Sequence, residues 1–236
     1  MRYAALITLP LMLAACGQGK APSEQLKDAA QQAVEDATGT APPQLGDGPI
    51  APRDECQDIK GSDIFRQQLA IAVEARDTDA LVAMASPDIK LDFGDGAGRD
   101  ELRRRLEAED GRLWSELDQL LTLGCGPSGA GGLVLPWYWS KGLDDVDPAS
   151  EMIVTGDNVP LRQSASADGA TIASVSWDAV ELVGGLQTDT AYQQVKTRDG
   201  QTGFMATKML RSVLDYRLFA ASRDGVWSIT SIVVGD

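Results

Sequence analysis

The chain has 236 residues, 43% of them hydrophobic, a formal net charge of −14 and no histidine. Because phosphate binding needs stripes of basic residues, this acidic composition argues against a nucleic-acid partner. The lack of histidine excludes Ser-His-Asp and Cys-His catalysis, imidazole bases and zinc sites that use histidine.

The first fifteen residues have the layout of a cleavable export signal. Arg2 supplies a positive start, residues 3–15 are apolar, and small residues precede Cys16. The run is too short to span a bilayer permanently. The tetrad Leu13-Ala14-Ala15-Cys16 resembles the lipobox of bacterial lipoproteins, which implies removal of the signal peptide and lipidation of Cys16. An ordinary secretory signal with an incidental cysteine is the alternative.

The same resemblance implies a cellular location. Gly17 follows the cysteine, at the position where inner-membrane retention in this family usually shows an aspartate. In a bacterium with two membranes we therefore expect a lipid anchor, such as palmitate on Cys16, that holds the chain to the outer membrane on the periplasmic side.

Export also bears on the remaining cysteines, Cys56 and Cys125. Paired cysteines persist as disulfides in an oxidising compartment, so we expect these two to be bonded. The bond would close a loop of about 70 residues and add about 4 kcal/mol on the chain-entropy estimate. Two unrelated buried thiols are the alternative; a redox pair is disfavoured because the spacing is not C-x-x-C.

Residues 16–54 are predicted to be a flexible tether. After the cysteine this segment is rich in Ala, Gln, Pro, Gly, Asp and Glu and has almost no large apolar side chains. It therefore cannot bury enough surface to offset chain entropy. Its expected role is to hold the globular part away from a membrane.

Helical spacing of apolar residues dominates the next region. The predicted elements are two helices between 62 and 85 broken at 76–79, a strand over 89–93, and helices over 99–107 and 112–121. Ser62 and Thr78 are the predicted N-caps. Ile89, Leu91 and Phe93 alternate with polar residues and form the expected buried side of the strand.

The triplet Trp137-Tyr138-Trp139 ends the stretch LVLPWYW. Interpreted as a strand, this stretch points Trp137 and Trp139 the same way, where two rings could stack on a sugar or a peptide. Both are therefore candidate ligand-binding residues. The alternative is that the rings cover an interface between two domains or fill the core of the first domain.

The acidic connector SKGLDDVDPAS is interpreted as a domain boundary. It lacks the spacing and the glycine of the twelve-residue calcium loop, so a solvated linker is expected and no metal or cofactor is predicted. Asp95, Asp100 and Glu101 are interpreted as turn and helix-start residues. No catalytic residue is predicted.

Short strands at close intervals follow the connector, with Asp168-Gly169 and Asp199-Gly200 as turn signals. This spacing predicts a small all-β barrel over residues 151–211.

The order of residues in this barrel region carries a family resemblance. Its landmarks are Leu161-Arg162, Ser164–Ser166, Ile172, Val180, Tyr192, Val195 and Gly203-Phe204-Met205. Together they resemble the bacterial Src-homology-3-like domain, with Tyr192 in place of the usual Trp, Phe204 in place of Trp or Tyr, and Pro160 interrupting the first strand. The resemblance implies a groove lined by Tyr192, Phe204 and Trp177 that binds a cell-wall peptide or another envelope ligand. The alternative is that these aromatic residues are core.

Two further strands, VLDYRLFAAS and VWSITSIVVG, follow Arg211 and are joined at Asp224-Gly225 as a two-residue hairpin. A minimal barrel does not need them, whereas the helices of the first region need a sheet to cover. We therefore expect the hairpin to complete the first domain, with the barrel inserted into it. In element order this domain, whose last strand carries Trp227, resembles the cone-shaped nuclear transport factor-like fold.

The predicted organisation is thus α+β. The segments are a signal peptide (1–15), a tether (16–54), an α+β domain (55–140 plus 212–236) and an inserted Src-homology-3-like barrel (151–211). The predicted function is a non-catalytic, lipid-anchored envelope protein whose barrel binds a peptidoglycan peptide or an envelope protein.

Two other functions stay open at this point. The α+β domain could bind a small molecule or carry carboxylate-based catalysis, which convergent buried acids would favour. A cavity filled by Phe65, Leu91, Trp114 and Trp227 would argue against both. The chain could also be a purely structural scaffold in an envelope assembly.

Overall fold

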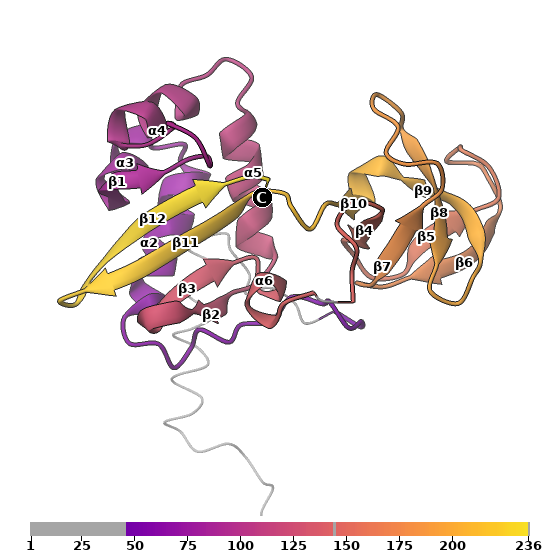
Figure 1. Cartoon of the computed structure of the whole chain (residues 1–236), viewed down its shortest axis with the longest axis horizontal. Helices are drawn as coiled ribbons and strands as arrows, with labels where there is room; N and C mark the ends of the chain where they lie inside the picture. The colour runs from indigo at the N-terminus through magenta and orange to yellow at the C-terminus, as the bar shows by residue number, and fades with distance from the viewer. Residues whose placement is uncertain (1–45, 144, 236) are drawn as a thin grey trace, which may run out of the picture. The chain divides into compact units, whose positions relative to one another are not determined.

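Two separate β-sheets and a group of helices make up this α+β protein (Figure 1). The computed structural model describes residues 46–143 and 145–235, and the described residues belong to one compact unit. The predicted signal peptide, the predicted lipidation site Cys16 and most of the predicted tether lie outside the described residues.

The first sheet has five strands in the order β1-β12-β11-β3-β2. Their bounds are β1 Ala85–Lys90, β2 Gly126–Ser128, β3 Gly132–Leu135, β11 Arg217–Arg223 and β12 Val226–Val233. β1 runs parallel to β12, and the other neighbours are antiparallel. The C-terminal hairpin β11–β12 therefore lies in the middle of the sheet (Figure 1). The hairpin therefore completes the sheet that the helices of the first region cover, as expected.

The turn of this hairpin has the predicted chemistry. Arg223 pairs with Val226, which leaves Asp224 and Gly225 as the two loop residues. Both have positive φ, 54° and 81°. A two-residue loop of this kind matches the twist of the flanking strands, and Asp-Gly adopts it at low cost.

Helices cover this sheet and supply most of its core. The helices are α2 Ser62–Glu74, α3 Thr78–Met84, α4 Arg99–Leu106, α5 Arg112–Thr122 and the short α6 Tyr138–Lys141, with a 3-10 turn η1 Gly129–Gly131; a second 3-10 turn, η2 Thr207–Met209, lies between the strands β9 Thr202–Ala206 and β10 Leu210–Arg211 of the other sheet. Apolar residues at helical spacing, among them Leu69, Val73, Leu102 and Leu117, pack with Leu218 and Ile229 of the hairpin. The four predicted helices before residue 123 are present.

The predicted helix caps are wrong by one residue. Helix α2 begins after Gly61, which has φ 77°, and the hydroxyl of Ser62 donates to the carbonyl of Cys56 at 2.6 Å. Helix α3 is capped by Asp77, whose carboxylate accepts from the backbone N–H of Ala80 at 2.9 Å. Each predicted cap residue instead begins the first turn.

A strand is predicted over residues 89–93, whereas the observed strand β1 covers Ala85–Lys90. Ile89 and Leu91 are buried as expected, but Phe93 is 62% exposed. The reason is a turn that the carboxylate of Asp92 stabilises by accepting from the backbone N–H groups of Gly94 and Gly96, each at 2.9 Å. This turn removes Phe93 from the alternation.

The second sheet is entirely antiparallel, with the order β10-β4-β7-β8-β9-β5-β6. Its strands are β4 Glu151–Val154, β5 Val159–Arg162, β6 Thr171–Val175, β7 Ala179–Leu182, β8 Tyr192–Thr197, β9 Thr202–Ala206 and β10 Leu210–Arg211. Alternate residues, including Leu161, Val180, Val195 and Met205, form a separate apolar core. All seven strands fall within residues 151–211.

Candidate functional site

The five aromatic residues predicted to bind a ligand lie in three different places. Tyr192 and Phe204 lie on neighbouring strands of the second sheet, Trp177 follows β6, and Trp137 and Trp139 lie at the start of α6. The structure therefore brings only one pair of the predicted residues onto the same strand face.

Tyr192 and Phe204 share the outer face of the second sheet. Tyr192 pairs with Ala206, and Gln194 pairs with Phe204. Because side chains alternate along a strand, Tyr192, Gln194 and Phe204 all point to one side, and the residues between them point into the core. Both aromatic rings are half-buried, so each leaves part of its surface available to a ligand.

The third strand of this face adds a cation and a proline. Arg162 of β5 pairs with Phe204, and Pro160 lies on the same side of β5 two residues earlier. The guanidinium of Arg162 donates to the carbonyl of Gly169 at 2.8 Å. Within the described part of the chain no carboxylate forms an ion pair with Arg162. We call Tyr192, Phe204, Arg162 and Pro160 the aromatic face.

Trp177 lies instead against the segment that precedes the first helix. Its carbonyl accepts from the backbone N–H of Ile50 at 2.9 Å. A Cβ atom added at Gly46 would lie 2.2 Å from the indole nitrogen of Trp177, so the ring leaves no room for a side chain there. The indole of Trp177 is therefore committed to packing on residues 46–50.

The prediction that Trp137 and Trp139 lie in a strand is wrong. Strand β3 ends at Leu135, because Pro136 has no N–H to donate to the sheet, and Trp137 has helical φ and ψ of −51° and −44°. Residues two apart in a helical segment do not face the same way. Trp137 and Trp139 therefore do not form the stacked pair expected from the sequence.

Trp137 is 3% exposed and belongs to a buried cluster that draws on both sheet regions. The cluster consists of Ile50, Trp137, Tyr138, Val146, Ile153, Ala179 and Val213, with Trp139 and Leu143 packed against it. Trp137 and Tyr138 are therefore buried in an apolar cluster, and Trp139 packs against it. Arg217 lies over the ring of Trp139, 4.0 Å from its centroid.

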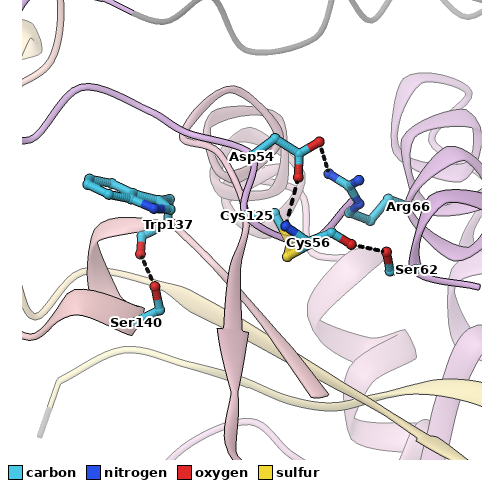
Figure 2. Close-up of a disulfide and its surroundings, with 7 residues drawn as sticks. All are labelled: Asp54, Cys56, Ser62, Arg66, Cys125, Trp137 and Ser140. Atoms are coloured by element: carbon cyan, nitrogen blue, oxygen red, sulfur yellow. Dashed lines mark hydrogen bonds and ion pairs between the residues drawn. A yellow bond between two sulfur atoms is a disulfide. The ribbon is translucent and has the colours of Figure 1, made fainter. Parts of the chain in front are cut away.

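Cys56 and Cys125 form a disulfide, as predicted (Figure 2). The carboxylate of Asp54 beside it accepts from the backbone N–H of Cys56 at 3.1 Å and pairs with Arg66 at 2.9 Å. Asp54, Cys56 and Cys125 lie close enough together to offer two sulfurs and a carboxylate to a metal. Because the sulfurs are bonded to each other, they are not thiolate ligands, and the cluster is structural.

The core of the first domain contains the aromatic and apolar residues that were expected to fill it. Phe65, Leu91 and Trp114 are buried, and Trp227 packs on them with its ring centroid 5.5 Å from that of Phe65. The indole of Trp114 donates to the carbonyl of Leu106 at 2.9 Å. These contacts belong to the packed core of the first domain.

One pair of acids converges on a buried cation. Glu116 and Asp215 each lie 3.4 Å from Arg211, which is 3% exposed. Burial raises the pKa of Glu116, and the negative charge of Asp215 adds to that rise while Arg211 opposes it. Arg211 also donates to the side chain of Gln119 and to the carbonyl of Tyr216. The guanidinium is bonded on several sides, which is the arrangement of a structural ion cluster.

No protein-family model and no curated protein matches this chain. Within residues 46–143 and 145–235, no helix has the length and apolar character needed to cross a membrane.

Proposed function

We propose that this protein is a non-catalytic, lipid-anchored component of a bacterial cell envelope. In this proposal its second sheet forms a Src-homology-3-like barrel that binds a cell-wall peptide or an envelope protein. The observation that carries it is the aromatic face, where Tyr192 and Phe204 lie on one side of adjacent strands with Arg162 beside them. The lipobox-like tetrad and Cys16 supply the proposed anchor.

The chemistry of the aromatic face suits an extended peptide that carries a carboxylate. Aromatic rings contribute large contact areas to peptide recognition, and partly exposed rings on one face can pack on successive residues. A guanidinium next to the rings can form charge-assisted hydrogen bonds with a ligand carboxylate. Arg162 has only a carbonyl partner among the described residues and can take this role.

The filled core of the first domain gives no support to the alternative of a small-molecule or carboxylate-based active site inside it. That alternative stays a prediction from the sequence.

The binding proposal is tested by retention on purified peptidoglycan. We expect the chain from Gln18 to Asp236, which contains every described residue, to be retained. The double variant Tyr192→Ala/Phe204→Ala should lose most of this retention, because truncating two contact aromatics removes at least about 2 kcal/mol of binding. Circular dichroism of the variant checks that it is still folded.

A matched control removes an exposed ring elsewhere. Phe93 is 62% exposed in the turn after β1, so Phe93→Ala should bind like wild type. Equal retention of wild type and the double variant would show that the aromatic face is not the binding site. If wild type is not retained either, peptidoglycan is not the ligand and an envelope protein is the remaining candidate.

The proposed anchor is tested separately by fractionating cells that express the full chain. Cys16→Ser removes the only thiol that the lipobox pattern offers for lipidation, so the variant should leave the membrane fraction. Gly17→Asp is the control, because it should keep the lipid and change only the choice of membrane. Membrane association of Cys16→Ser equal to that of wild type would contradict the anchor.

A further inference from the structure

A cavity of about 390 Å³ lies beside the buried ring of Trp137. It is lined by the segment before α2, by residues from 137–143 and 145–146, and by the second sheet's loops at Asp178 and Arg198. This volume is in the range of small-ligand sites, which often form where separate structural regions meet.

Cations gather at this cavity in a protein that is strongly acidic overall. Arg53, Lys141 and Arg198 all line it, although the whole chain has only 21 Lys and Arg against 35 Asp and Glu. The ring of Trp137 holds two of them by cation–π contacts. The guanidinium carbon of Arg53 lies 4.9 Å from the ring centroid, and the amine of Lys141 lies 5.8 Å from it.

Two of these three cations already have partners. Lys141 pairs with Glu55 at 3.3 Å, and Arg198 pairs with Asp178 at 3.1 Å. Arg53 differs, since no carboxylate of the described residues forms an ion pair with its guanidinium. A positioned guanidinium with free donors is the group that proteins use to bind carboxylates by two parallel hydrogen bonds.

The rest of the lining shows what kind of anion fits. Ile50, Leu143 and Val146 present apolar surface, which suits a ligand with an apolar body. Asp145 and Asp178 line the same cavity; their charges repel any anion, and the repulsion grows with the number of negative charges on the ligand, so a single carboxylate is opposed least. Trp137 lines the cavity, and its indole N–H is buried with no acceptor among the described residues.

We propose that this cavity binds a small monocarboxylate with an apolar body, with its carboxylate on Arg53 and its apolar part against Ile50, Leu143 and Val146. This site is separate from the aromatic face and does not depend on the proposed function. If no monocarboxylate binds in this cavity, the expected retention on peptidoglycan is unaffected.

The test uses three probes of similar shape and different charge: phenylacetate, 2-phenylacetamide and phenethylammonium. Indole N–H signals are followed by nitrogen-15 NMR on the chain from Gln18 to Asp236, and the signal of Trp137 is identified by its loss in Trp137→Phe. We expect phenylacetate to shift this signal in a saturable way. The amide and the ammonium should bind at least about tenfold more weakly, because they lose the charge-assisted bonds to Arg53.

Variants then locate the carboxylate. Arg53→Gln should weaken phenylacetate at least about fivefold. Arg53 is exposed, so this change should leave the fold intact. Arg112→Gln is the matched control, since Arg112 also lies over an aromatic ring, that of Tyr216 at 5.9 Å, but does not line the cavity. An unsaturable shift, equal binding of amide and carboxylate, or an unchanged affinity in Arg53→Gln would each overturn the proposal.

Discussion

Deletion of residues 213–236 is expected to unfold the first sheet and the helices that cover it. Strand β12 lies between β1 and β11, and β11 lies between β12 and β3. Without the hairpin, β1 has no strand partner and β2–β3 is an isolated pair, which is marginal in water. The apolar sides of α2, α4 and α5 would also face solvent. Loss of helical circular dichroism and of cooperative urea unfolding would measure this.

Point variants in the hairpin give a graded version of the same experiment. Leu218 in β11 is fully buried in the core, so Leu218→Ala should cost about 2 to 5 kcal/mol of unfolding free energy. Val226 lies in the same hairpin but is 71% exposed, so Val226→Ala should stay within about 0.5 kcal/mol of wild type. An intact helical core after the deletion would show that the hairpin belongs elsewhere.

Removal of the disulfide is expected to cost about 4 kcal/mol on the chain-entropy estimate, since the bond joins residues 69 apart. The disulfide fastens the chain before α2 to the residues before β2. Backbone bonds run alongside it, from the N–H of Glu55 to the carbonyl of Cys125 and from the N–H of Cys125 to the carbonyl of Arg53. These bonds would have to hold the segment alone after reduction.

The measurement is urea unfolding of the Cys16→Ser chain with and without a reductant, so that the reductant acts on this one pair. The urea concentration at the midpoint of unfolding should fall sharply when the disulfide is reduced. The double variant Cys56→Ala/Cys125→Ala should unfold early in both conditions, which controls for other effects of the reductant. Free thiols at both positions in non-reducing peptide mapping would refute the bond.

Local sequence patterns were sufficient for much of the fold. The helices around Leu69, Leu102 and Leu117 formed where apolar residues recur at helical spacing, because that spacing places them on one side of a helix. Asp224-Gly225 marked its hairpin because few other pairs tolerate two positive φ angles in succession. The place of this hairpin in the first sheet was inferred from the need of helices for a sheet to cover.

The candidate sites were less predictable because they depend on turns and distant contacts. Phe93 leaves its expected strand because of hydrogen bonds that the carboxylate of Asp92 makes in the following turn. Trp137 and Trp139 lie at a helix start rather than in a strand, since Pro136 ends β3. In the aromatic face, the alternation of buried and outward-facing residues along β8 and β9 can be predicted from the sequence. The pairing of β5 with β9, which places Arg162 beside Phe204, cannot.

The sequence by itself determined the local elements, the pairing of the two remaining cysteines and the acidic character of the chain, because each depends on near neighbours or on simple counting. Only the tertiary structure decided which aromatic residues share a face and that Arg53, Lys141 and Arg198 line one cavity. Those cations are far apart along the chain, and no local pattern links them. The buried cluster of Trp137, Ile50, Ile153 and Ala179 brings together the chain segments that carry these three cations.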